Sequence, residues 1–181
     1  MRAVSRRASE IYNSSEILAN PDCFQIVQSD ASGKDGCGYV FASYHELNYS
    51  YYSKVWPGVP PEQSHEAELL ALEAYFVRDS KPKTLVLWIT DSQSAAWTVN
   101  KGNCDDPIGR PILARILGMR DAAMCQLFAM WVRRQLNELS DHLSHLSHIM
   151  DRDEIAGHRL EVTARPGFET SRAAESSGGA A

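Results

Sequence analysis

The feature that most constrains the fold is a continuous apolar run of strand length, Thr84-Leu-Val-Leu-Trp-Ile-Thr90, which is followed directly by Asp91. A run of this kind without alternation is typical of a central strand that is covered on both faces. In open α/β sheets, ligands bind beyond the carboxyl ends of such strands. Asp91 is therefore a candidate site residue, and its structural alternative is the N-cap of a helix that begins at Ser92.

The patterns on either side of this run predict the remaining elements. Residues 24–30 and 37–43 predict two strands joined by a turn with two glycines, and residues 48–54 predict a third strand. Helices are predicted over 62–78, 92–100, 108–124 and 137–147, with a further strand over 126–133. An antiparallel opening followed by alternating strands and helices predicts an α/β fold with one mixed sheet and helices packed against it.

The two ends of the chain differ in composition from its middle. Residues 1–21 mix Ser, Arg and Asn with one short apolar patch and end at Pro21, so we expect a linker or the frayed end of a preceding domain. From residue 149 the chain is rich in Asp, Arg, Glu, Gly and Ala, and we expect a disordered tail over 149–181. This leaves one folded domain over 22–148.

Composition excludes several classes of protein. A net charge of −5 argues against a large basic surface for nucleic acid, so any such binding depends on local positive groups or metal ions. The four cysteines form no C-x-x-C pair, which argues against a zinc ribbon or a redox motif. No apolar run approaches the roughly 20 residues that span a bilayer. We expect an intracellular protein with no membrane partner, in the cytoplasm or nucleus.

Four acids fall where they can converge. Asp30 ends the first strand, Glu68 lies in the first long helix, Asp91 follows the apolar strand, and Asp141 comes early in the last helix. Taken singly, Asp30 suits an ordinary turn and Glu68 suits a solvated helix face. Glu66 competes with Glu68, but the two positions lie on different helix faces, so at most one of them meets Asp30 and Asp91.

The segments around these acids resemble the ribonuclease H family in order and in local sequence. The matching segments are Ser29-Asp30-Ala-Ser-Gly33 with Gly38, Ala67-Glu68-Leu-Leu-Ala71-Leu, Ile89-Thr90-Asp91-Ser-Gln93, and Asn137-Glu-Leu-Ser-Asp141 between Trp131-Val132 and Leu143-Ser144. The last of these most resembles the ribonuclease H domains of retroelement reverse transcriptases, of the DIRS and LTR types. The resemblance covers roughly Asp22 to Ser147.

This resemblance implies both a fold and a function. The fold is ribonuclease H-like, with a mixed five-stranded sheet of antiparallel opening hairpins and then parallel strands, and helices on both faces. The implied activity is hydrolysis of the RNA strand of an RNA–DNA hybrid with two Mg²⁺ ions, for which Mn²⁺ can substitute. Asp30, Glu68, Asp91 and Asp141 would be the catalytic metal ligands, and carboxylates suit these hard cations. The implied partner is an adjacent reverse transcriptase domain in a polyprotein.

Several further residues are candidates for nucleic-acid contact. Trp97 follows Asp91 on the next helix, and Gln93 and Asn100 on the same helix are candidates for reading 2′-hydroxyls. The guanidinium groups of Arg133 and Arg134 suit a phosphate backbone, although a solvated strand end explains them as well. From the matching segments we add Ser32 and Asn137.

One departure from the family pattern leaves a second interpretation open. Many members carry a histidine in a loop shortly before the last acid, and none stands between Trp131 and Asp141 here. His142, His145 and His148 rotate by about 60° at each step around a helix, which disfavours a compact metal site. The alternative is therefore an inactive, nucleic-acid-binding remnant of the fold. A transposase ranks third, because it would require a glutamate as the distal acid.

Overall fold

The computed structural model describes residues 23–43, 49–56, 60–145 and 158–162. Its strands are β1 (Phe24–Ala31), β2 (Gly36–Ser43), β3 (Tyr49–Val55), β4 (Leu85–Thr90), β5 (Gln126–Trp131) and β6 (His158–Val162). Its helices are α3 (Ser64–Arg78), α4 (Gln93–Lys101), α5 (Gly109–Ala122), the short 3₁₀ turn η2 (Arg134–Leu136) and α6 (Glu138–Ser144). None of these described helices has the length and apolar character needed to cross a membrane.

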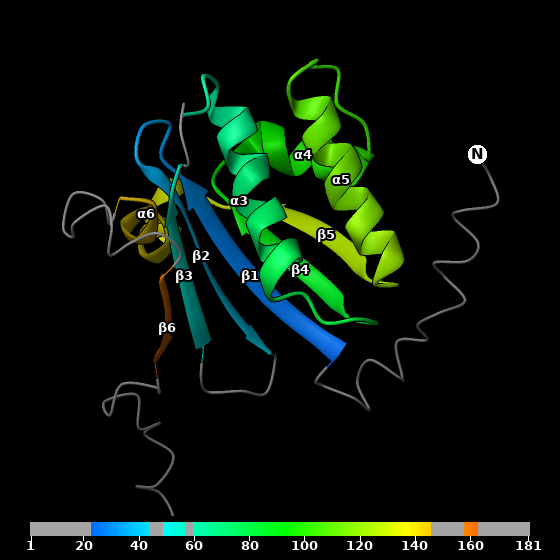
Figure 1. Cartoon of the computed structure of the whole chain (residues 1–181), viewed down its shortest axis with the longest axis horizontal. Coiled ribbons are helices and arrows are strands. Elements are labelled where there is room, and N and C mark those ends of the chain that lie inside the picture. Colours follow the sequence, from blue (N-terminus) through cyan, green and yellow to red (C-terminus); the bar gives the residue numbers. More distant parts are fainter. Residues whose placement is uncertain (1–22, 44–48, 57–59, 146–157, 163–181) are drawn as a thin grey trace, which may run out of the picture.

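The strands form one mixed sheet in the order β5-β4-β1-β2-β3-β6 (Figure 1). β1 pairs antiparallel with β2 and parallel with β4, while β3 pairs antiparallel with β2, and β5 pairs parallel with β4. The α/β fold and the five predicted strands are confirmed. β6 adds a sixth strand, antiparallel to β3, inside the segment that we expected to be a disordered tail. The local composition does not predict β6, because this strand forms through backbone hydrogen bonds to β3, which is distant in the sequence.

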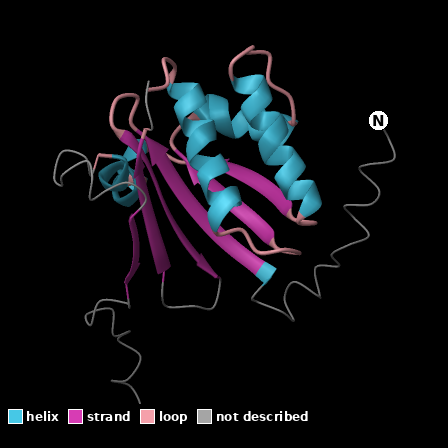
Figure 2. Ribbon diagram, in the orientation of Figure 1, coloured by secondary structure: helices cyan, strands magenta, loops and turns pink. Residues whose placement is uncertain are grey.

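Helices cover both faces of the sheet (Figure 2). α3, α4 and α5 lie on one face, and α6 packs against β1, β2 and β3 on the other. The predicted linker over 1–21, His148 and the remainder of the predicted tail, 149–157 and 163–181, lie outside the described residues.

The core lies between the sheet and the helices α3 and α5. Val27, Tyr39 and Trp88 project from three neighbouring strands and are fully buried there, together with Leu72 and Tyr75 of α3. The run over 84–90 alternates in burial, since Val86 and Trp88 enter this core while Leu85 and Leu87 are half-buried on the opposite face. The predicted central position of this strand is confirmed, because β4 lies between β1 and β5. The predicted cover on both faces is wrong, because the side chains on the face opposite α3 and α5 are only half-buried.

On the other face, a glycine allows α6 to approach the sheet closely. A Cβ at Gly38 of β2 would lie 2.3 Å from Cβ of Leu143, so no other residue leaves room for α6 at this distance. Ser53 of β3 donates a 2.6 Å hydrogen bond to the carbonyl of Leu143. These contacts fix α6 beside the end of β1, where Asp30 lies.

Candidate active site

Three acids from three separate elements meet at one end of the sheet. Asp30 lies near the carboxyl end of β1, and Asp91 directly follows β4, the parallel neighbour of β1. Glu68 enters from the second turn of α3. One carboxylate oxygen from each of the three lies within 4.8 Å of the others, and among the described residues this is the one such group of acids, histidines and cysteines. The structure thus brings together three of the four predicted ligands.

Glu68 is held in this position from two sides. Its helix buries Leu69 and Leu72 against the sheet, which turns the neighbouring carboxylate toward the strand ends. Thr90 donates a 3.1 Å hydrogen bond to Oε2 of Glu68, and the backbone N–H of Ala31 also donates to this carboxylate. Only 5% of Glu68 is exposed, which is unusual for a glutamate and indicates that its place is specified.

The other two acids are also oriented by neighbours. The hydroxyl of Ser144, in α6, donates a 2.7 Å hydrogen bond to Oδ2 of Asp30. The indole of Trp131 donates a 3.0 Å hydrogen bond to the carbonyl of Asp91. The N-cap of α4 is Ser92, whose side chain accepts from the N–H of Ala95, so the N-cap interpretation of Asp91 is wrong. Sequence reasoning missed the orienting role of Thr90, and Ser144 appeared only as part of the resembling segment.

Burial and mutual repulsion set the electrostatics of the cluster. The pKa of Asp30 is raised to about 6, with burial as the largest cause; the charges of Asp91 and Asp141 contribute to the rise, and the hydrogen bond from Ser144 opposes it. Burial also raises the pKa of Glu68 well above its ordinary value, and the charges of Asp30 and Asp91 add to the effect. The cluster therefore favours bound protons or a bound cation over three free carboxylates.

The fourth predicted ligand, Asp141, stands apart from this group. Its carboxylate pairs with the guanidinium of Arg134 at 2.5 Å, and its side chain is 31% exposed. Its charge still raises the pKa of Asp30, so it faces the same region. Among the described residues, the group of carboxylates within mutual reach contains Asp30, Glu68 and Asp91 without Asp141.

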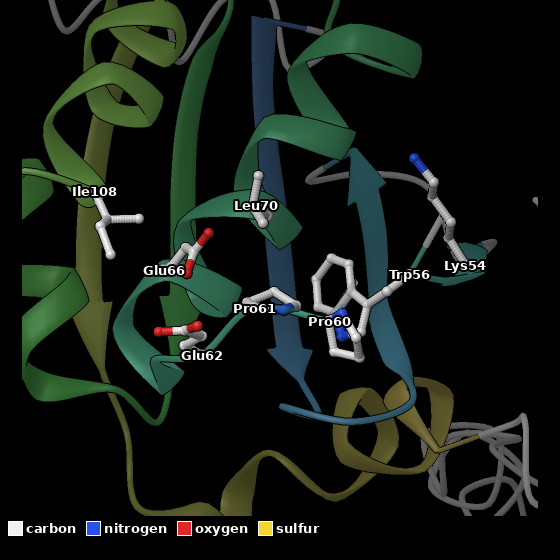
Figure 3. Close-up of a pocket in the computed structure, with 8 residues that line it drawn as sticks. All are labelled: Lys54, Trp56, Pro60, Pro61, Glu62, Glu66, Leu70 and Ile108. Carbon is white, nitrogen blue, oxygen red and sulfur yellow. The ribbon is translucent and has the colours of Figure 1, made fainter. Parts of the chain in front are cut away.

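Glu66, the alternative to Glu68, faces a different part of the surface. It lines a pocket of about 500 Å³ together with Trp56, Pro60 and Glu62 (Figure 3). In this view Glu66 lies on the side of α3 next to Ile108. The separation of positions 66 and 68 onto different helix faces therefore holds, and it is Glu68 that joins the acid cluster.

The predicted nucleic-acid contacts divide into two groups. Gln93, Trp97, Arg133 and Arg134 are exposed, and Trp97 is 71% exposed on α4. The polar groups of Ser32, Asn100 and Asn137 bond within the protein instead, as the following contacts show.

Ser32 donates to Asp35 at 2.9 Å in the turn between β1 and β2. The amide of Asn100 both donates to and accepts from the backbone of Ala129, each at 2.8 Å, along the outer edge of β5. Asn137 is fully buried and donates to the carbonyl of Ser29. Direct contact of Asn137 with a ligand is therefore excluded in this conformation. Its side chain instead links the start of α6 to β1.

The described histidines of the last helix do not join the acid cluster. His145 contacts Asp35 at 3.1 Å, and His142 is exposed on α6.

The fold matches that of solved ribonuclease H domains. The N-terminal RNase H domain of a Mycobacterium tuberculosis protein, solved as a fusion with maltose-binding protein, has 15% identity and a TM-score of 0.54, covering 66% of this chain and 95% of that one. RNase H1 of Halobacterium salinarum has 16% identity and a TM-score of 0.53, covering 70% and 96%. An RNase H1 isolated from compost has 18% identity and a TM-score of 0.51, covering 67% and 92%. No family model and no curated protein matches the sequence. The structural matches establish a ribonuclease H-like fold.

Proposed function

We propose that this chain is a metal-dependent ribonuclease H that hydrolyses the RNA strand of RNA–DNA hybrids. The observation that carries this proposal is the convergence of Asp30, Glu68 and Asp91 within 4.8 Å at the carboxyl ends of β1 and β4. It is supported by the ribonuclease H-like fold and by the resemblance of the segments that contain these acids.

The donor set fits a hard divalent cation. All three side chains offer carboxylate oxygens, the ligands that Mg²⁺ and Mn²⁺ prefer, and the group contains no cysteine or histidine. The raised pKa values of Asp30 and Glu68 reflect burial and repulsion that a cation would relieve. When bound, two such ions would supply a hydroxide-like water and neutralise charge on the phosphate. We propose Mg²⁺, with Mn²⁺ as substitute and Asp141 as a fourth ligand.

The surrounding side chains would keep the ligands in place. Ser144 and Thr90 each donate a hydrogen bond to a carboxylate, which limits its rotation. Outer groups of this kind orient metal ligands and raise the affinity of a site. Arg134 neutralises Asp141 in the structure, and the same guanidinium is placed to meet a phosphate close to the acids.

We assign the hybrid-binding surface to exposed residues near the cluster. Trp97 presents a large aromatic face to solvent, and Gln93 lies on the same helix two residues after Asp91. An exposed aromatic ring can stack on a base or a ribose. Arg133, next to Arg134, adds positive charge to a chain whose net charge is −5. On the sequence resemblance, we further propose that the chain works beside a reverse transcriptase domain of a retroelement, in the cytoplasm or nucleus.

The test is cleavage of a labelled RNA–DNA hybrid, with single-stranded RNA and duplex DNA as control substrates, in Mg²⁺ or Mn²⁺. The matched variants are Asp91→Asn, in the cluster, and Asp105→Asn, whose carboxylate is 87% exposed and pairs with Lys101. We expect hybrid-specific cleavage that Asp91→Asn abolishes and Asp105→Asn retains. A folded protein that binds the hybrid but does not cut it, even with Mn²⁺, would instead identify an inactive binding remnant.

A further inference from the structure

A histidine outside the acid cluster connects α3, which carries Glu68, with α4, which begins shortly after Asp91. His65 lies in the first turn of α3, three residues before Glu68. Its Nδ1 contacts Oγ of Ser94 at 3.4 Å, in the first turn of α4 and three residues after Asp91. Residues three apart share one side of a helix, so His65 and Glu68 project from α3 in similar directions.

The second ring nitrogen of His65 is held by the loop between α4 and α5. Its Nε2 lies 3.7 Å from Sγ of Cys104, a buried residue. The loop is compact here, because Asp106 accepts a hydrogen bond from the N–H of Gly109 and Arg110 donates to the carbonyl of Cys104.

The packing around this ring leaves little freedom. A Cβ at Gly109 would lie 2.9 Å from Sγ of Cys104 and 3.3 Å from Cδ2 of His65, so a larger residue at 109 would press on both. The imidazole of His65 is thus contacted at both nitrogens, and a side chain at position 109 would meet its edge. Through these contacts, His65 ties the start of α3 to the start of α4 and to the loop after it.

We infer that His65 is a positioning residue, which holds the start of α4, and with it Asp91, at the distance from Glu68 that the metal ligands require. The inference rests on the proposed function, since it concerns the same acid cluster. β4 passes directly into α4 through Asp91 and Ser92, so a displacement of Ser94 moves the ligand three residues before it. The hydrogen bond from Thr90 to Glu68 is a second direct link between these segments.

The decisive measurement is the affinity of the metal-free chain for Mn²⁺, titrated without substrate. Loss of an outer partner typically weakens a metal site about 10–100-fold, and His65 acts one step further out. We therefore expect His65→Ala and Ser94→Ala each to raise the Kd for Mn²⁺ about 5- to 10-fold. The double variant should bind Mn²⁺ only slightly more weakly than either single variant, because each single change already removes the same contact between His65 and Ser94. His65→Gln, whose amide can still bond Ser94, should recover most of the affinity.

The controls separate the possible outcomes. His142→Ala removes an exposed histidine of α6 and should bind Mn²⁺ like the unchanged chain. Ser94→Ala changes an exposed side chain outside the core, so this variant should fold normally. Unchanged Mn²⁺ affinity in His65→Ala, with a raised KM for hybrid, would overturn the inference and make His65 a substrate contact. Additive losses in the double variant would also overturn it. If the unchanged chain and Asp91→Asn bind Mn²⁺ equally weakly, the proposed metal site itself fails.

Discussion

Replacing Asp30 with asparagine should stabilise the metal-free protein, although it removes a proposed catalytic ligand. The pKa of Asp30 is raised from 3.8 to about 6, mainly by burial. A pKa difference of one between the folded and unfolded chain corresponds to about 1.4 kcal/mol, so the ionised carboxylate destabilises the fold by up to about 3 kcal/mol. Asparagine has a similar shape and can still accept the hydrogen bond from Ser144. We expect Asp30→Asn to gain about 1–3 kcal/mol at pH 8.

The pH dependence of this gain follows from the raised pKa. The folded chain holds the proton of Asp30 between about pH 4 and pH 6, where the unfolded chain has lost it. The destabilisation is therefore complete above about pH 6 and disappears as the pH falls toward 4. The advantage of Asp30→Asn should be largest at pH 8 and should vanish near pH 4.

Thermal unfolding in EDTA, at pH 8 and at pH 4.5, measures this effect. For a domain of this size, the expected gain at pH 8 is roughly 3–10 °C in Tm. Asp105→Asn is the control, since its exposed carboxylate should leave Tm nearly unchanged. Added Mg²⁺ should raise the Tm of the unchanged chain more than that of Asp30→Asn. An Asp30→Asn protein that is no more stable than the unchanged chain at pH 8 in EDTA would refute the reasoning.

Three other variants test separate parts of the structure. Gly38→Ala would place Cβ 2.3 Å from that of Leu143, so we expect a loss of roughly 1–3 kcal/mol in denaturant unfolding; unchanged stability would contradict the close approach of α6. Asn137→Ala leaves the buried carbonyl of Ser29 without its donor and should cost about 1–3 kcal/mol, whereas the exposed control Asn103→Ala should cost less than about 0.5 kcal/mol. Trp97→Ala, at a 71% exposed position, should weaken hybrid binding about 5- to 20-fold in a filter-binding assay with Tm unchanged; a lowered Tm with normal binding would assign Trp97 to stability instead.

The strand and helix patterns predicted the frame of the site because they depend on local periodicity. Asp30 and Asp91 follow β-forming runs, and the parallel pairing of β1 and β4 brings their ends together. The choice between Glu66 and Glu68 depended on the helix face, and the convergence of Glu68 with Asp30 and Asp91 decides it. These placements follow from repeats of two and of 3.6 residues, which are visible in the sequence.

What the sequence did not reveal depends on contacts between distant segments. Asn137 was a candidate for nucleic-acid contact, but it is fully buried because α6 packs over β1 and places its amide at the carbonyl of Ser29. Asn100 pairs with the backbone of β5, 29 residues away in the chain. Asp141 lies on a short helix whose approach is set by Gly38, and Arg134 draws its carboxylate away from the group. Spacing along the chain carries no information about such partners.

Strand β6 matters for the choice of C-terminal boundary when a shorter version of the chain is produced. β6 pairs along β3 from Tyr49 to Ser53, and so covers the backbone of a strand rich in tyrosine. A version of the chain that ends at residue 148 would leave those N–H and C=O groups open to solvent. Exposed strand edges of this kind recruit strands from other molecules and promote aggregation. Keeping residues through Val162 should therefore matter more for a monodisperse preparation than the composition of this segment suggests.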